Sequence, residues 1–403
     1  MTGAGGVFGE DSHTFTLIAN GARVPVLVPV HPPSPNMATT IPVINIAHLC
    51  HPHPDYTSVE LQHCAQAIHS ACATVGFFYI SGWESIVCRR NIVRLETLAK
   101  EFFQWPRHEK MKIAMKNSGL HWKGYFPSGD ELTSGKPDAK EGIYFGEEYA
   151  LESKQVQHHK LAMHGPNQFP GTGVLHEEWK QCVLLYLEEL THLGLCLMRG
   201  ISLSLQLPPN YFEKTFCQPR PFTPFRIFQY PGNDVRQGVG RHTDYGCLTI
   251  LKQDNVGGLE VEVQPGHWEA APPIENTFVV NIGDMLEIWT SGVYKATPHR
   301  VVPGLSRTRM SMPFFFDPAF EAVIDPEEMK LGSIMLKNAA GENEIVLASG
   351  HGGGSGNGGS NATQDNANKQ GKIRYGDYIS HKVSAVFPEL FESSGGKDRL
   401  SKM

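Results

Sequence analysis

The chain has 403 residues, of which 40% are hydrophobic, so it can bury one large core or the cores of two subdomains. Its net charge of −6 offers no basic stripe, which argues against a nucleic acid partner and disfavours oxidative nucleobase demethylation. Apolar stretches fall short of the ~18 residues that cross a bilayer, so we expect no membrane association.

The cysteines and the chain ends bear on localisation. The eight cysteines form no C-x-x-C pair and no short-range framework, which is typical of a reducing compartment. The N-terminal run MTGAGGVFGEDSHTF lacks the basic and apolar regions of a secretory signal. We therefore predict a cytoplasmic protein. The alternative is the peroxisome, because the final tripeptide Ser401-Lys402-Met403 is a conservative variant of the S-K-L address.

Composition and periodicity divide the chain into six predicted segments. They are an N-terminal extension (1–40), an N-terminal α/β region (41–165), a long scaffold helix (166–221), a β-rich core (222–336), a low-complexity insertion (337–372) and a C-terminal helix with a tail (373–403). The extension is broken by HPPSPN, and Met37 after it is a second possible start of translation. The insertion is rich in Gly, Ser and Asn and cannot form a core.

Three amphipathic helices are predicted before the β-rich core. Apolar residues recur at helical spacing over residues 59–72, and Gly76 ends this helix before the strand FFYI. A second helical pattern covers 86–103. A third covers 174–205 and stops at a pair of prolines. A helix of that length usually lies behind a sheet, so we interpret it as the scaffold of the core.

From residue 222 to residue 316 the pattern changes to short strands with turn signals, which is typical of a jelly roll. His242 and Asp244 form an H-x-D pair in RHTDYGCLTILKQ, a run that reads as extended, so both side chains should point the same way. His299 follows in the β-rich stretch YKATPHRVV. Two imidazoles and one carboxylate on neighbouring strands can hold one face of a metal octahedron, as in the facial triad of non-haem iron sites.

The H-x-D pattern is weak by itself. With 19 His and 41 acidic residues in 403, chance gives about two H-x-[DE] matches (19 × 41/403). Three further matches, which begin at His53, His176 and His267, lie in segments that read as loop, helix and turn. None of these presents both side chains on one face of a strand, so the pair at His242 is the candidate that remains.

A second constellation follows His299. The run RTRMSMPFFF alternates, which places Arg309, Ser311 and Pro313 on one face of a strand. A guanidinium fork beside a hydroxyl in a half-buried site suits a carboxylate. A surface ion pair is the alternative, and the position of Arg309 inside an apolar strand argues against it. Pro298 indicates an edge strand or a bulge at the distal histidine.

Taken together, these runs resemble the Fe(II)/2-oxoglutarate-dependent dioxygenase family, in its isopenicillin N synthase-like (iron/ascorbate oxidoreductase) group. The likeness covers residues 41–388 and extends to IPVINIAHL, ATVGFFYISG, KEGIYFGEE, FRIFQYPG and YGDYISHKVSAVFP. It implies an α+β, mainly β fold: a double-stranded β-helix (jelly-roll) core over 222–336, backed by helices, with an α/β N-terminal region.

Carried over by position, the resemblance implies a set of iron ligands, namely His242, Asp244 and His299. It also implies a site for the cosubstrate 2-oxoglutarate, made of Arg309, Ser311 and Tyr230. Plant members commonly have N-x-Y-P before the core, whereas this chain has Phe228 at the asparagine position. The chain therefore departs from the plant pattern but keeps the anchor for the carboxylate.

The implied reaction is the oxidation of a small organic molecule by O2, with hydroxylation as the default outcome and with release of succinate and CO2. Desaturation and ring closure would use the same residues. Two alternatives stay open: an oxidase of the same fold that uses ascorbate or its substrate as reductant in place of 2-oxoglutarate, and a jelly-roll binding protein without catalysis.

Candidates for the substrate pocket come from the loops and strands that shape the barrel mouth in this family. The apolar candidates are Tyr125, Phe126, Tyr144 and Phe228. Lys123 and Lys140 are cationic candidates for an anionic substrate, and Phe228, Phe314 and Phe316 are aromatic candidates for the walls around the iron. Each of these side chains is also a natural core or surface residue, so the substrate assignment is the weaker part of the prediction.

Overall fold

The computed structural model describes residues 14–19, 22–27, 41–149, 163–234, 236, 238–302, 305–324 and 373–387. The predictions about Met37, the insertion at 337–372 and the final tripeptide lie outside these residues. Strands β1 (Thr14–Ala19) and β2 (Ala22–Leu27) pair antiparallel within the predicted extension.

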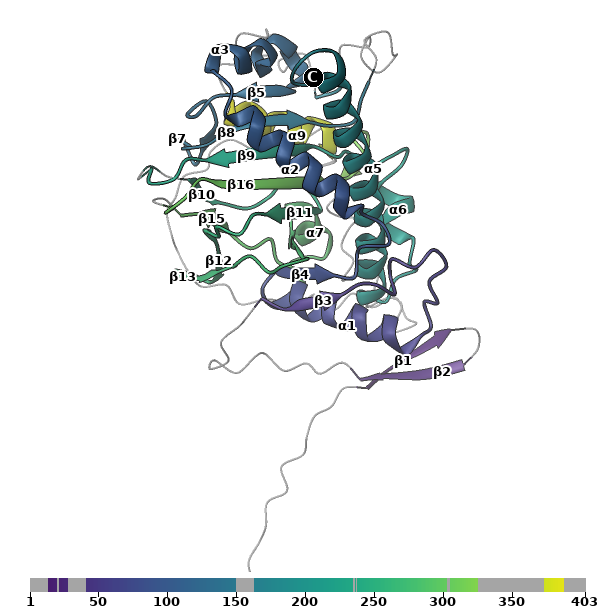
Figure 1. Ribbon diagram of the computed structural model, residues 1–403. Coiled ribbons are helices and arrows are strands. Elements are labelled where there is room, and N and C mark those ends of the chain that lie inside the picture. Colours follow the sequence, from purple (N-terminus) through teal and green to yellow (C-terminus); the bar gives the residue numbers. More distant parts are fainter. Residues whose placement is uncertain are drawn as a thin grey trace, which may run out of the picture.

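Two β-sheets form the body of the protein (Figure 1). In spatial order the larger sheet contains β3 (Val43–Asn45), β4 (Phe77–Ser81), β14 (Phe278–Ile282), β11 (Leu248–Gln253), β16 (Arg309–Phe316), β9 (Phe225–Tyr230), β8 (Glu141–Phe145) and β5 (Gly124–Phe126). The smaller sheet contains β10 (Val239–His242), β15 (His299–Val301), β12 (Leu259–Gln264) and β13 (His267–Ala270). Except for the parallel pair β3 and β4, neighbouring strands run antiparallel, which confirms the predicted jelly-roll core.

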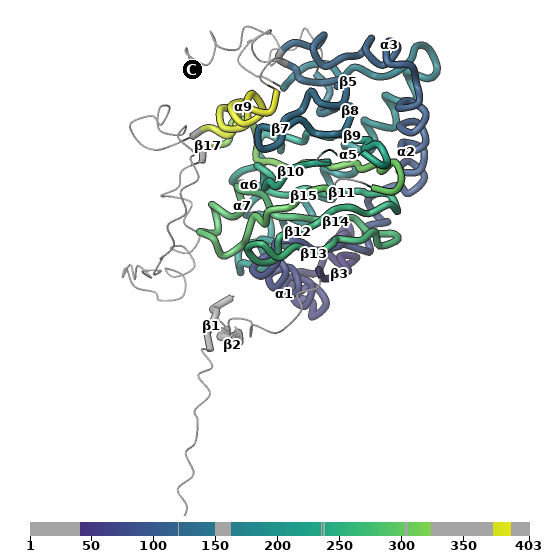
Figure 2. Tube along the Cα trace, turned by 90° about the vertical axis from the view of Figure 1, so that its left-hand side faces the viewer, coloured from purple at the N-terminus to yellow at the C-terminus, as the bar shows by residue number. Residues whose placement is uncertain are grey.

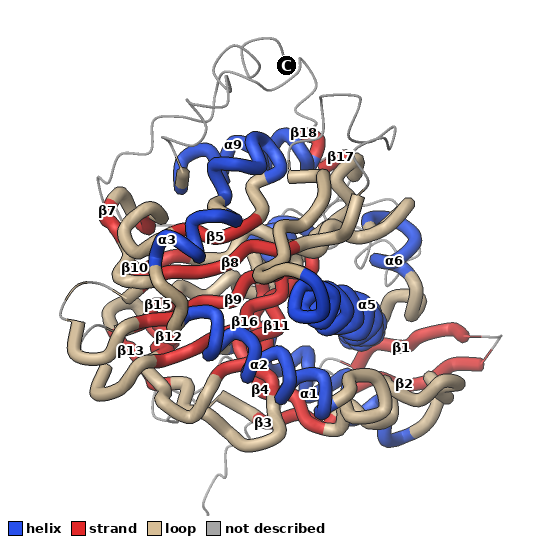
Figure 3. The backbone as a smooth tube through the Cα atoms, turned by 45° about the horizontal axis from the view of Figure 1, so that its top comes forward, coloured by secondary structure: helices blue, strands red, loops and turns tan. Residues whose placement is uncertain are grey.

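Helices cover the outer face of the larger sheet (Figure 3). The helical elements are α1 (Val59–Thr74), α2 (Arg89–Phe103), α3 (Arg107–Lys110), α5 (Gly173–Ser204), α6 (Tyr211–Phe216), α7 (Asp284–Trp289) and α9 (Tyr375–Val386), with 3-10 turns η1 (Met111–Ile113) and η2 (Met115–His121). Helix α5 packs on α1 and α2 and also contacts β16 and β11. The long helix therefore lies behind the strands of the core, as its apolar periodicity predicted.

The helix ends follow from local sequence. Ser58 caps α1, because its hydroxyl accepts a hydrogen bond from the backbone N–H of Leu61. Helix α2 begins at Arg89, three residues later than predicted from Ile86, because the chain first closes a separate turn. In that turn the N–H of Ile86 donates to the carbonyl of Trp83 over 2.9 Å.

Helix α5 is the one element among the described residues that is long and apolar enough to cross a membrane by length and composition, which the sequence analysis did not expect. Half of its most apolar window is buried inside the protein. Its buried side chains include Trp179, Tyr186, Leu190 and Leu193. Burial of a large apolar side chain contributes about 1.5–3 kcal/mol to folding, so packing in the core accounts for this composition.

The approach of α5 to the sheet depends on Gly194. A Cβ atom at this position would lie 2.2 Å from Cδ2 of Phe316, closer than van der Waals contact permits. A glycine in a helix interior normally costs about 1 kcal/mol relative to alanine. Here the glycine lets the helix backbone pack closely against the ring of Phe316 on β16. This contact holds in place the strand that carries Arg309 and Ser311.

Elements outside the two sheets lie at one end of the core. The hairpin of β6 (Leu132–Thr133) and β7 (Lys136–Pro137) contacts both β10 and α9. Helix α9 lies beside this hairpin (Figure 2) and follows the short pair β17 (Val323–Ile324) and β18 (Ile373–Arg374). Segments about 240 residues apart in sequence, at 132–137 and 375–386, thus meet at the same end of the barrel.

Candidate active site

His242, Asp244 and His299 meet at one end of the smaller sheet. His242 and His299 are direct cross-strand partners on β10 and β15, and one ligand atom from each of the three residues lies within 4.8 Å of the others. The Nε2 atoms of His242 and His299 are each 3.8 Å from an oxygen of Asp244. Pro298 predicted an edge strand or a bulge at His299, but β15 lies between β10 and β12, and the extra residue of the irregular β10–β15 pair lies on β10, between Val239 and His242.

Backbone carbonyls set the tautomer of both histidines. Nδ1 of His242 donates to the carbonyl of Gly240 over 2.8 Å, and Nδ1 of His299 donates to the carbonyl of Thr297 over 3.2 Å. A carbonyl can only accept, so the proton lies on Nδ1 and the lone pair on Nε2. Both Nε2 lone pairs therefore face the carboxylate and are available to a metal ion.

Asp244 lies in the loop between β10 and β11, which differs from the predicted continuous extended segment. The chain bends after Asp244 because the first turn of α7 binds this loop: the N–H of Asp284 donates to the carbonyl of Asp244 over 2.8 Å. Gly246 permits the bend, since a Cβ atom there would overlap the carboxylate of Asp317. The side chain nevertheless reaches both histidines.

Two neutral donors orient the carboxylate of Asp244. The hydroxyl of Thr249 and the amide of Asn281 both donate to Oδ2, the latter over 2.8 Å. Burial raises the pKa of Asp244, but the two histidines and these hydrogen bonds outweigh it and leave the pKa below its usual value. Burial and then His299 lower the pKa of His242 to about 4. Fe(II) binds an ionised carboxylate and neutral imidazoles, so the lowered pKa values of Asp244 and His242 favour its binding.

Arg309 and Ser311 lie on the inner face of β16, as the alternating pattern predicted. Both side chains are buried, Arg309 to 1% exposure, and they stand opposite Tyr230 and Phe228 on β9. The Arg309 guanidinium lies 4.9 Å from the centre of the Tyr230 ring. Its Nε and Nη1 atoms are buried without a hydrogen-bond partner in the described part of the chain. Unpaired buried donors are costly, so this guanidinium fits the distal carboxylate of 2-oxoglutarate.

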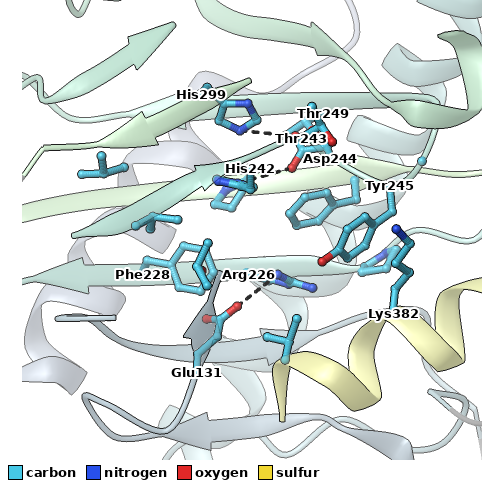
Figure 4. A pocket seen from close by; sticks show the side chains of 18 of the residues that line it. Glu131, Arg226, Phe228, His242, Thr243, Asp244, Tyr245, Thr249, His299 and Lys382 are labelled. Atoms are coloured by element: carbon cyan, nitrogen blue, oxygen red, sulfur yellow. Dashed lines mark hydrogen bonds and ion pairs between the residues drawn. The ribbon is translucent and has the colours of Figure 1, made fainter. Parts of the chain in front are cut away.

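One cavity joins these groups. It has a volume of about 440 Å³ and is lined by the three candidate ligands, by Arg309, Ser311 and Tyr230, and by residues from β9, the β6–β7 hairpin and α9. Figure 4 shows His242, Asp244 and His299 on one side of it and Arg226 with Glu131 on the other, while Lys382 enters from α9. The size suits a small organic molecule beside a cosubstrate.

The predicted aromatic residues are divided between the cavity and the core. Phe228 lines the cavity, and Phe315 lines it in place of the predicted Phe314 and Phe316. Alternation along β16 explains this correction, because Phe314 and Phe316 point to the opposite face, where Phe316 meets α5 at Gly194.

The remaining predicted substrate residues lie behind the cavity wall. The ring of Tyr125 packs against Phe102 of α2, and its hydroxyl donates to Glu141 over 2.6 Å. Phe126 and Tyr144 pack against each other, with ring centres 5.3 Å apart. They belong to β5 and β8, the two strands beyond β9 at the edge of the sheet, so they support the wall and do not line it.

The two predicted lysines are also engaged by the protein. Nζ of Lys123 donates to the carbonyl of Gly165 over 2.6 Å and is not part of the cavity. Lys140 lines the cavity but pairs with Glu131 at 2.9 Å and with Asp138 at 2.5 Å.

Six charged cavity residues were missed by sequence reasoning: Glu131, Arg226, Arg241, Asp284, Asp317 and Lys382. Only Arg226 carried a usable signal. It precedes Phe228 and Tyr230 by two and four residues in FRIFQY, so alternation along a strand places all three on one face.

Comparisons with known proteins agree with the geometry. The model of the 2OG-Fe(II) oxygenase superfamily matches residues 221–318, and the model described as non-haem dioxygenase in morphine synthesis N-terminal matches residues 41–172. A probable iron/ascorbate oxidoreductase of Dictyostelium discoideum is 39% identical over 353 residues, which cover 81% of this chain and 89% of that protein. A homoarginine-6-hydroxylase of Arabidopsis thaliana is 35% identical over 302 residues, which cover 71% and 87%.

Solved structures show the same fold. The crystal structure of a 2OG-Fe(II) oxygenase family protein from Caulobacter crescentus superposes with a TM-score of 0.63 at 24% identity, covering 86% of this chain and 99% of that one. Family models, relatives and fold converge on one conclusion. The chain belongs to the 2OG-Fe(II) oxygenase superfamily and is a non-haem iron, 2-oxoglutarate-dependent oxidoreductase.

Proposed function

We propose that this protein hydroxylates a small polar organic molecule and couples the reaction to the conversion of 2-oxoglutarate into succinate and CO2. The observation that carries the proposal is the cavity itself. The cluster of His242, Asp244 and His299 and the buried guanidinium of Arg309, with its unpaired donors, open into the same 440 Å³ space. A cavity of this size leaves room for a small substrate and none for a folded protein.

In this proposal the chain holds iron through His242, Asp244 and His299, and it holds the distal carboxylate of 2-oxoglutarate through Arg309 and Ser311. Iron supplies the oxidising chemistry when it is bound together with 2-oxoglutarate and O2. The protein orients both imidazole rings through their Nδ1 hydrogen bonds, orients the Asp244 carboxylate and excludes water with Phe228 and Phe315. The proposal includes ascorbate as an additional reductant.

The substrate class is proposed from the relatives and from the cavity. One relative at 35% identity is named for homoarginine, an amino acid that carries a carboxylate and cationic groups. The far side of the cavity holds charges of both signs, among them Glu131, Arg226 and Lys382. Charged groups of both signs suit a small polar or zwitterionic molecule.

We further propose a cytoplasmic location, with the peroxisome as the alternative, and no nucleic acid or membrane partner. All eight cysteines are free, which supports a reducing compartment. Expression of the full chain with and without residues 401–403, followed by imaging against a peroxisomal marker, tests the two locations. Colocalisation that depends on the tripeptide would establish the alternative.

The test of the function is an anaerobic titration of the Fe(II)-loaded protein with 2-oxoglutarate, followed by the visible metal-to-ligand charge-transfer band. We expect a band in the parent protein that is lost in Asp244→Ala and requires far more 2-oxoglutarate in Arg309→Met. Iron bound without a band would favour an oxidase that does not use 2-oxoglutarate. Failure to bind iron would contradict catalysis by this site.

A further inference from the structure

We infer that Arg226 binds a carboxylate of the substrate, so that the substrate is a small organic acid or amino acid. This inference deepens the proposed function and depends on it. Arg226 lies on β9 and its guanidinium lines the same cavity as the candidate iron ligands. Arg226 is not part of the cosubstrate anchor formed by Arg309 and Ser311, because it lies at the other end of β9.

The strand register separates the two arginines. On β9 the residues that face the cavity are Arg226, Phe228 and Tyr230, and Tyr230 is the partner of Arg309 on β16. Arg226 is therefore four residues along the strand from the cosubstrate anchor, or roughly 13 Å. A five-carbon diacid held at Arg309 does not span this distance and also chelate a metal at the triad. A second anion is needed to reach Arg226.

The hydrogen-bonding capacity of Arg226 is unused. Within the described residues its nitrogens make no hydrogen bond: Nε is buried without a partner, and Nη1 stands 3.7 Å from Oε1 of Glu131. That carboxylate already accepts the hydroxyl of Tyr144 over 2.9 Å and pairs with Lys140 at 2.9 Å. A partly buried guanidinium with an unpartnered Nε resembles Arg309, the group that fits the 2-oxoglutarate carboxylate.

Aromatic rings position the guanidinium so that an edge stays free for a ligand. Its Cζ lies 4.2 Å from the ring centre of Tyr144 and 4.6 Å from that of Phe315. The rings supply cation–π contacts and hold the guanidinium plane in place. Figure 4 shows the group across the cavity from His242 and Asp244, with Glu131 on one side of it and Tyr245 on the other. A planar carboxylate can approach it from the cavity and form two parallel hydrogen bonds.

Arg226 makes one long ion pair, with Glu131 at 3.7 Å, whereas the other cations on this side of the cavity have shorter pairs or, for Lys382, aromatic contacts and a nearby acid. Lys140 pairs with Glu131 and Asp138, Arg241 pairs with Glu262 at 2.7 Å, and Lys382 lies close enough to Asp284 to affect its pKa. Away from the cosubstrate anchor, Arg226 is thus the cavity cation best placed for a substrate carboxylate. Lys140 provides a matched control: it is a buried cation of the same cluster that the protein itself neutralises.

The first experiment compares full-length, Fe(II)-loaded parent protein with Arg226→Met and Arg226→Lys at saturating 2-oxoglutarate. A panel of small carboxylic acids and amino acids, each paired with its primary amide, is assayed for O2-dependent succinate formation. We expect turnover of acids but not of their amides. Arg226→Met should lower kcat/KM for the acid roughly 30-fold or more, and Arg226→Lys should restore part of the loss. The charge-transfer band with 2-oxoglutarate should persist in both variants.

The second experiment measures thermal unfolding without substrate. Arg226→Met should leave the Tm unchanged or raise it, because it removes a partly buried charge that makes no hydrogen bond in the described residues, while Glu131 keeps its closer pair with Lys140. Lys140→Met should lower the Tm by several degrees, because it removes the cation shared by two buried carboxylates, Glu131 and Asp138. Equal drops in both variants would make Arg226 structural and overturn the inference. Turnover of amides as fast as acids, no turnover of any acid, or full activity of Arg226→Met would overturn it too. A parent protein without the band would refute the proposed function, and the inference with it.

Discussion

The inner face of the larger sheet lines the cavity, with Arg309 at one end and Arg226 at the other. These two ends are built in different ways. Arg309 is 1% exposed, and its surroundings, Ser311 and Tyr230, belong to the adjacent strands β16 and β9. The Arg226 side chain is 17% exposed, and its end of the cavity is completed by the β6–β7 hairpin region and helix α9. One end is made by strand register alone, whereas the other depends on segments outside the two sheets.

This difference separates the residues that every reaction of the enzyme needs from the residues that select the substrate. Residues on paired strands are held by the hydrogen-bond ladder, so Arg309, Ser311 and Tyr230 keep their relative positions within the larger sheet, and His242 and His299 keep theirs within the smaller one. Hairpins and terminal helices can change in sequence and length at little cost to the core. Variants at the Arg309 end should therefore impair every reaction of the enzyme, whereas variants at the Arg226 end should act on the substrate or on local stability.

The largest effect is expected from Asp244→Ala. It removes the carboxylate between two imidazoles and leaves the donors of Thr249 and Asn281 without their acceptor. Iron binding and succinate formation should fall to background. Iron stoichiometry and succinate assays measure both. Asp234→Ala, which removes an acid that pairs with Arg236, should keep full iron content, and iron retained in Asp244→Ala would dismiss the proposed ligand set.

Replacement of Arg309 should have the second largest effect. Loss of a buried, charge-assisted pair costs about 2–5 kcal/mol, so Arg309→Met should raise the Kd for 2-oxoglutarate by roughly 30- to 3000-fold. Arg309→Lys should retain part of the affinity, because an ammonium cannot form the two parallel bonds of a guanidinium. Ser311→Ala should lose roughly tenfold at most. Anaerobic titration of the charge-transfer band gives these constants, and an unchanged Kd in Arg309→Met would place the cosubstrate elsewhere.

At the other end of the cavity, Asp317 should make stability depend on pH. Burial raises its pKa to about 7, and its Oδ1 lacks a hydrogen-bond partner in the described residues. Between its usual pKa of 3.8 and about 7, the folded protein keeps a proton that the unfolded chain has released. Stability therefore decreases as pH rises through this window, by up to roughly 4 kcal/mol.

Asp317→Asn should remove that dependence. Chemical denaturation of metal-free parent and variant from pH 4 to pH 8 measures it, and the gain in stability of the variant should grow with pH. Parallel curves for the two proteins would show that the carboxyl is solvated. The 2-oxoglutarate affinity measured by the charge-transfer band should change little, because Asp317 lies away from Arg309 and Ser311.

The smallest effect is expected from Thr249→Val, which keeps the shape of the side chain and removes one hydrogen bond to Asp244. Groups that orient metal ligands typically contribute 10- to 100-fold in affinity, and Asn281 still supports the same oxygen, so we expect about tenfold weaker Fe(II) binding. A competition titration for Fe(II) measures this. Thr277→Val, in a turn where the hydroxyl donates to the carbonyl of Ile274, should leave the affinity unchanged.

The residues at the cosubstrate end of the cavity, Arg309 and Ser311, could be predicted from the sequence because both lie on one strand. Alternation along a strand has a period of two, so Arg309 and Ser311 had to share a face wherever the strand lay. The sequence prediction failed where the chain bends and where it had to decide which face of a strand lines the cavity. Asp244 follows a strand and does not continue it, because α7 binds the loop, and Phe314 and Phe316 face the helices.

The Arg226 end depended on contacts between distant segments. Glu131 from the hairpin region, Arg226 from β9 and Lys382 from α9 are brought together by packing of α9 on β6, and no local period relates them. The sequence by itself determined the strands, the long helix and the residues that share a strand face, because backbone geometry ties these to spacing. Only the tertiary structure decided which charges meet across the cavity and which are left unpaired, because burial and ion pairing depend on the whole packed chain.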